Sequence, residues 1–252
     1  MQPILIGNED QVFSILGNFL KGVLDPAVEI VRGQENRVPE PSASDFVVMW
    51  PLTQTRLATN EETENDVAFT GSISGTTLTV SAMIEGVIVS GATLYGVNIP
   101  DSPPVTIQSQ LTGTTGGVGT YQISTSLTVA SETIQAGTTN SQQSTQRTFQ
   151  FDVHGPNSSN NAQLITTLWR SEYGVTQMAS LIAALTPPGQ FEMAPLYAND
   201  PRQIPFLNAE QQYENKWAVE AVFQINPIVQ TQQQYAGSVS VALKSVSANY
   251  PV

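Results

Sequence analysis

A long segment without basic residues constrains the fold of this chain most strongly. Between Val67 and Asn140 there is no lysine or arginine, and the only acids are Glu85, Asp101 and Glu132. Threonine, serine, valine, isoleucine and glycine dominate the segment, whereas the flanking parts carry all the basic residues and the helical patterns. This change in composition predicts a small all-β module inserted into one loop of an α+β domain.

The predicted organisation is therefore discontinuous. Residues 1–65 and 139–252 form one α+β core, and residues 66–138 form an inserted all-β domain. The chain has 252 residues, of which 40% are hydrophobic, enough to bury a core in one large domain or in two smaller ones. The two halves of the core belong to one fold. We look for the function in that fold.

Composition excludes several classes of protein. A net charge of -12 argues against binding nucleic acid by neutralising phosphates. Without cysteine there is no disulfide framework and no thiolate metal site. No apolar run has the length of a membrane span, and no signal peptide is evident, so we expect a soluble protein. Only 12% of residues are charged, so Ser, Thr, Asn and Gln must cover much of the surface.

Periodic patterns in the flanking parts predict the core fold. Residues 9–24 carry one apolar stripe at helical spacing, with Asn8 as the N-cap. Further helices are expected after Ser158 or Ser159 and around residues 175–185. We expect a connection at the Gln-rich residues 230–234, and strands at 28–32, 46–57, 142–153, 213–224 and 238–246. Together, these helices and strands predict a mostly antiparallel sheet with two or three helices on one face.

Short strands separated by glycine turns are predicted within the basic-free segment. The run from Gly116 to Tyr121 predicts a turn that leads into a strand anchored by an aromatic side chain. A small sandwich or barrel is favoured over a disordered Gly/Ser/Thr-rich loop, because Val, Ile and Leu alternate as a core requires. The expected strands are 77–83, 92–95, 105–110, 120–124 and 127–129.

No convincing active site is present. His154 is the only histidine, and a metal site there would need Asp152 and distant carboxylates. Ser158, His154 and Asp152 are too close along the chain for a catalytic triad, and no G-x-S-x-G motif occurs. The chain is therefore predicted to have no enzymatic activity and no cofactor, and His154 is interpreted as a polar residue at a strand end.

Two groups of residues are candidates for contacts with other parts of an assembly. The acidic run with Glu61, Glu62, Glu64 and Asp66 is either a solvated linker or the acidic rim or lumen of a ring that repels DNA phosphates. The three tryptophans lie on apolar patterns typical of a core, but one of them, at a strand end, is also an interface candidate. From pattern alone, the candidates for contacts between subunits or rings are Arg37, Pro39, Trp50, Pro51 and Arg56.

Several motifs on both sides of the basic-free segment resemble the neck terminator proteins of tailed bacteriophages. They are NRVPEP at 36–41, FVVMWPL at 46–52, TRLATN at 55–60, QSTQ at 143–146 and FDVHGPNSSNNA at 151–162. The resemblance covers residues 1–65 and 138–252. The segment between them is similar to a Gly/Thr-rich β-module that recurs in phage structural proteins.

The resemblance implies a ring, expected to be a homo-hexamer, at the head-proximal end of the phage tail. Such a ring ends assembly of the tail tube, and of the sheath where one exists, and joins the head-side connector, adaptor or collar protein. Genome DNA passes through it without specific binding. The expected location is the neck of the virion, after assembly in the host cytoplasm, with no membrane contact.

Two other hypotheses remain open. The chain is a connector or collar component whose β-insert binds a glycan or another virion protein, or it is a hydrolase or metal-dependent enzyme centred on His154.

Overall fold

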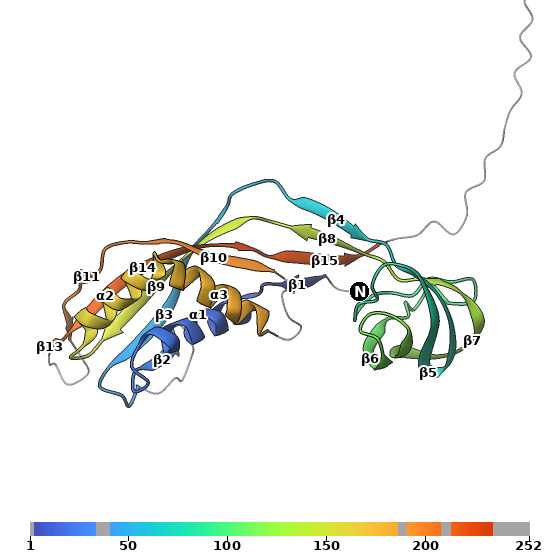
Figure 1. The fold of residues 1–252 in the computed structure, drawn as a ribbon, viewed down its shortest axis with the longest axis horizontal. Helices are drawn as coiled ribbons and strands as arrows, with labels where there is room; N and C mark the ends of the chain where they lie inside the picture. Colours follow the sequence, from blue (N-terminus) through green and yellow to red (C-terminus); the bar gives the residue numbers. More distant parts are fainter. Residues whose placement is uncertain (1–2, 34–40, 186–190, 208–212, 234–252) are drawn as a thin grey trace, which may run out of the picture. The chain divides into compact units, whose positions relative to one another are not determined.

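The computed structural model describes residues 3–33, 41–185, 191–207 and 213–233 of the chain. These residues divide into two compact units (Figure 1). Of the described residues, one unit takes 64–139 and 231–233, and the other takes those up to residue 63 and those between 140 and 230. Each unit has its own cluster of buried hydrophobic side chains.

The main sheet of the larger unit has the strand order β10-β14-β9-β3-β2, and β11 also pairs with β14. Strands β3, β9, β10 and β14 pair antiparallel, whereas β2 runs parallel to β3. The bounds are β2 (Glu29–Arg32), β3 (Phe46–Arg56), β9 (Thr145–His154), β10 (Glu192–Ala198), β11 (Arg202–Gln203) and β14 (Lys216–Asn226).

Three helices pack on one face of this sheet: α1 (Glu9–Val23), α2 (Ser158–Trp169) and α3 (Glu172–Ala183). Phe149 of β9 meets Phe13 of α1 edge to face, with ring centroids 5.2 Å apart. Trp169 of α2 meets Phe19 at 5.4 Å and donates its indole N–H to the Val222 carbonyl oxygen at 3.1 Å. Helices on one face of a largely antiparallel sheet make an α+β fold.

Helix α1 begins where the sequence predicts it. The Asn8 side chain accepts a hydrogen bond from the Gln11 backbone N–H, and the Gln11 side chain accepts one from the Asn8 N–H. This reciprocal pair is a capping box, which satisfies two of the free N–H groups at a helix start. Within the apolar stripe of α1, Val12, Leu16 and Leu20 are fully buried.

A second sheet has the order β1-β15-β8-β4, formed by β1 (Ile4–Ile6), β15 (Ile228–Gln232), β8 (Thr138–Gln142) and β4 (Glu61–Asn65). The boundary between the two units falls within β4, β8 and β15. Two expectations are corrected here. Residues 230–232, predicted as part of a connection, belong to β15. Residues 61–65 of the acidic run form β4, which is not the solvated linker considered as one of its two interpretations. A further short pair joins β12 (Phe206–Leu207) to β13 (Tyr213–Glu214), and the strand expected at 238–246 lies outside the described residues.

The smaller unit contains the sheet β5-β7-β6, built from β5 (Ala68–Glu85), β7 (Gly119–Gln135) and β6 (Ile107–Gly113). This antiparallel sheet replaces the expected sandwich or barrel of short strands, and residues 92–95 contribute only isolated bridges. Its core includes Phe69, Leu78 and Ile134, all fully buried. The predicted turn before Tyr121 is present, and the Tyr121 hydroxyl donates to the Gly117 carbonyl at 2.6 Å.

Candidate assembly surface

The predicted contact residues that the structure describes all lie on β3. Trp50 pairs with Gln150 and Pro51 with Phe149, so their side chains point to opposite faces of the sheet. Arg56 ends the strand and is exposed. Arg37 and Pro39 lie outside the described residues. The strand therefore distributes these candidates over two faces of the sheet.

Trp50 is half-buried on the sheet face away from the helices. A Cβ atom added to Gly33 would lie 2.5 Å from the Trp50 ring, so the indole rests directly on this glycine. The indole Nε1 is buried and has no hydrogen-bond partner among the described residues. A buried tryptophan N–H usually has an acceptor. The indole N–H of Trp50 therefore lies buried and unpaired next to the end of β2.

A polar network lies on the same face of the sheet. Asp152 is only 4% exposed, and its carboxylate oxygens pair with Lys216 Nζ at 2.7 Å and with Gln150 Nε2 at 2.6 Å. Removing one partner of a buried charge pair strongly destabilises the folded protein, because the other charge is left buried and unpaired. These contacts commit Asp152 to a structural role in place of the metal or triad role considered from the sequence.

His154 ends β9 beside this network. Its Nδ1 lies 3.1 Å from Glu214 Oε1, and its ring stacks on Phe46 with centroids 4.4 Å apart. Burial lowers the pKa of His154, and the hydrogen bond to Glu214 opposes that shift. The side chain is therefore a buried polar group at a strand end.

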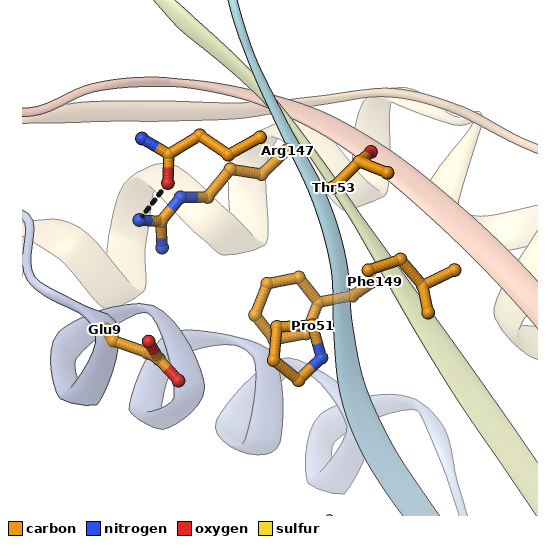
Figure 2. A pocket seen from close by; sticks show the side chains of 7 residues that line it. Glu9, Pro51, Thr53, Arg147 and Phe149 are labelled. Carbon is orange, nitrogen blue, oxygen red and sulfur yellow. Dashed lines mark hydrogen bonds between the residues drawn. The ribbon is translucent and has the colours of Figure 1, made fainter.

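A small pocket on the helix-facing side of the sheet surrounds Arg147 (Figure 2). It has a volume of about 140 Å³, with Pro51 and Phe149 as its apolar wall and Glu9 opposite the guanidinium. Arg147 Nη2 donates to Gln54 Oε1 at 2.8 Å, while its Nε is buried without a partner among the described residues. Burial lowers the pKa of Arg147, and the charge of Glu9 counteracts this.

Arg147 is a candidate contact residue that the sequence analysis missed. It has the same strand parity as Phe149 and Phe151, which face the core. An arginine among the core-facing positions of a strand is unusual. This break in the apolar alternation is the sequence signal that could have identified Arg147. Arg56 lies nearby in the pairing register and donates to the Ala58 carbonyl and to Asn60 Oδ1.

The acidic candidates lie on or directly after β4, the last strand of the second sheet. Glu61, Glu62, Glu64 and Asp66 are exposed. Asp66 accepts a hydrogen bond from Gln233 Nε2 at 2.6 Å, and Glu62 accepts a long one from Ser141 Oγ at 3.5 Å. Within the described ranges no lysine or arginine forms an ion pair with any of the four.

Comparison with protein families decides the identity. Residues 79–246, two thirds of the chain, match the family model described as phage neck terminator protein. The chain belongs to the phage neck terminator family. It is therefore a structural protein of the phage tail neck, as the resemblance of its motifs predicts. No curated protein matches the chain.

The family match extends into the smaller unit of this neck terminator. It begins within β5 and includes all of β6 and β7, residues that the sequence analysis attributes to an insert. Within the described part of the terminator, no three His, Cys, Asp or Glu side chains are grouped as a metal site would require. No helix among the described residues is long and apolar enough to cross a membrane.

Proposed function

We propose that this neck terminator assembles into a hexameric ring at the head-proximal end of the tail. The ring ends polymerisation of the tail tube, and of the sheath where the tail has one, and it joins the head-side connector, adaptor or collar protein. The observation that carries this proposal is the family match over residues 79–246. The protein is made in the host cytoplasm and acts in the virion by assembly, without catalysis or a cofactor.

The charge distribution supports a channel through which DNA moves freely. Binding of DNA is driven largely by counterion release when basic groups neutralise phosphates. The exposed acids of β4 have no basic partner within the described residues, so DNA beside them would be repelled. We propose that Glu61, Glu62, Glu64 and Asp66 lie at the lumen or its rim.

The subunit contacts are proposed to be mainly polar. The charged fraction of 12% leaves Asn, Gln, Ser and Thr as the main polar surface groups. The exposed guanidinium of Arg56 and the half-buried indole of Trp50 are proposed to contact a neighbour, and Pro51 lines the Arg147 pocket. Arg37 and Pro39 are proposed as further contacts with a neighbouring subunit or ring.

Deletion of the gene from its phage tests the proposed function. Electron microscopy of the lysate is expected to show filled heads, and separate tubes of irregular length, because nothing stops polymerisation or provides the joint. Expression of the protein from a plasmid restores joined particles. Normal, head-joined tails in the deletion strain would contradict the proposal.

A second candidate function concerns residues 66–138, which we propose to be an inserted binding module for a glycan or another virion protein. It is favoured by a separate core and by exposed apolar side chains, notably Val97, which is 92% exposed.

Strands β4 and β8, which flank the segment, are neighbours in one sheet, so an Asn-Gly turn can replace residues 66–138. Loss of adsorption alone would identify a binding module; loss of tail completion would show that the segment belongs to the terminator itself.

A further inference from the structure

Strand β1 has an open outer edge. It is the first strand of its sheet and pairs with β15 along its inner edge. An edge strand presents backbone N–H and C=O groups with which another strand can pair. The edge strands β2 and β4 carry charged side chains, and β10 carries Pro195 and a register shift, all features that discourage such pairing. Strand β1, with the sequence ILI, has no charge and pairs in continuous register.

Exposed apolar side chains lie beside this edge. Leu5 pairs with Val229 of β15, and the two are 47% and 38% exposed. Both line a pocket of about 330 Å³, to which Pro227 and several polar side chains also contribute. All the lining residues belong to the larger unit. A strand added along β1 would direct alternate side chains into this pocket and cover Leu5.

Residues 238–246 have the pattern that such a strand requires. They lie outside the described residues, and their sequence is SVSVALKSV. Val239, Val241 and Leu243 share one parity, while serine, alanine and lysine occupy the other up to residue 244. This alternation predicts a strand with one apolar and one solvated face. The family match extends to residue 246, so the whole segment belongs to the part of the chain that the family shares.

The arrangement of the sheet favours a second copy as the source of this segment. Strand β15 has β1 on one side and β8 on the other, so residues 238–246 cannot form a hairpin with it. A short link over residues 234–237 would turn the same chain back parallel to β1, because β1 and β15 are antiparallel. Parallel pairing is slightly less stable per residue than antiparallel pairing. The segment of another copy can pair antiparallel to β1, as β15 does.

We propose that residues 238–246 of a second copy pair with the outer edge of β1 and place an apolar side chain beside Leu5 in the pocket. Because β1 is short, the pocket contacts must supplement the few main-chain hydrogen bonds. The inference rests on the proposed ring and names one contact within it. Each copy gives its segment to one neighbour and receives a segment from the other, a head-to-tail exchange that closes in a ring.

Disulfide cross-linking tests this contact directly, since the chain has no natural cysteine. Leu5→Cys is combined in one chain with Val239→Cys, Val241→Cys or Leu243→Cys, and each double variant is oxidised at a concentration at which the wild type assembles. Side chains directly opposite each other on paired strands come within reach of a disulfide. At least one double variant is expected to give a ladder of covalently joined chains in non-reducing electrophoresis.

Two controls define the geometry. Ser240→Cys combined with Leu5→Cys places the second thiol on the opposite parity, so much less cross-linked product is expected. Mixing chains that carry Leu5→Cys alone with chains that carry Val241→Cys, Val239→Cys or Leu243→Cys alone should give a covalent dimer with one chain of each kind.

A charge at the β1 edge provides an independent measurement. Leu5→Asp is expected to raise the concentration for half-assembly about tenfold in sedimentation velocity, because the pocket contact would bury the new carboxylate. The unfolding temperature of the dilute monomer should change little, since Leu5 is 47% exposed there. Leu111→Asp is the matched control, because this leucine of the smaller unit is 51% exposed and its substitution should leave half-assembly unchanged.

The outcomes separate this inference from the proposed function. If the wild type assembles but no double variant forms cross-links between chains, the exchange is overturned while the ring stands. Cross-links within one chain alone, seen as a faster-migrating monomer, would show that the segment docks on its own β1 and would also overturn the exchange. Unchanged half-assembly in Leu5→Asp would do the same. If the wild type stays monomeric at every concentration, the exchange and the ring are both overturned.

Discussion

Single residues hold this fold together where separate segments approach most closely. Gly155 allows β9 to turn into α2 beside the loop before β3, and Gly33 provides the flat surface on which Trp50 rests. His154 and Asp152 show a second kind of constraint, since both are polar groups buried on a sheet face and each contacts an ionisable partner. Changes at these positions are therefore expected to alter stability more than surface changes do.

Gly155→Ala is expected to destabilise the chain strongly. Its φ of +101° is unfavourable for an L side chain, and the added methyl group would collide with the Ser44 carbonyl oxygen. The expected loss is about 2–4 kcal/mol in urea unfolding. Gly75→Ala is the matched control, because φ there is +65° but no atom lies within 4 Å, so about 1 kcal/mol is expected. Equal losses at both sites would contradict the predicted collision.

The pH dependence of stability should carry a contribution from His154. Burial lowers its folded-state pKa below the ordinary value, so the unfolded chain binds the proton more readily. The contribution is present above about pH 6.5 and is lost as the pH falls from there towards the folded pKa. Stability is thus expected to rise with pH across this window.

NMR titration and the variant His154→Gln check this prediction. The chain has one histidine, so its imidazole signals need no assignment, and they should titrate below about pH 6.5. In His154→Gln, the unfolding free energy should change less steeply between pH 5 and 7. A folded-state pKa above the ordinary value would show that the Glu214 interaction outweighs burial.

Elements with local signals could be predicted from the sequence, and elements defined by their neighbours could not. Helix α1 carries an apolar stripe and a capping residue within 16 positions, so its bounds follow from local physics. Strand β4 has no apolar residue at all and becomes a strand only beside β8. Strand β15 likewise depends on pairing with β1, which lies more than 200 residues away along the chain.

The candidate surface was predictable only in part for the same reason. Trp50, Pro51 and Arg56 stand out along one predicted strand, and the structure places all three on β3. Their role as contacts stays a prediction. Arg147 was missed, since its significance is an unsatisfied buried donor. Unsatisfied donors are properties of packing between segments and leave little trace in the order of residues.

The acidic strand β4 leads to a prediction about DNA. In assembled protein, changing Glu61, Glu62 and Glu64 to lysine should create DNA binding that weakens steeply with salt, whereas the wild type does not bind. The control changes the exposed acids Glu85, Asp101 and Glu172 to lysine, with the same shift in net charge. Fluorescence anisotropy at low and moderate salt measures both. Equal DNA binding by the two variants would show that β4 does not face the DNA path.

At the scale of the whole molecule, the chain has two compact units of contrasting composition, and the family match covers residues of both. The chain's negative charge and small charged fraction favour contacts with neighbours through neutral polar side chains. The proposed function therefore depends on self-assembly of the chain.

Native mass spectrometry of the purified protein, alone and with tail tube protein, tests this dependence most directly. We predict one dominant species at six times the 27.1-kDa chain mass, in equilibrium with the monomer on dilution. Only monomers at all concentrations, even with tube protein present, would contradict the ring.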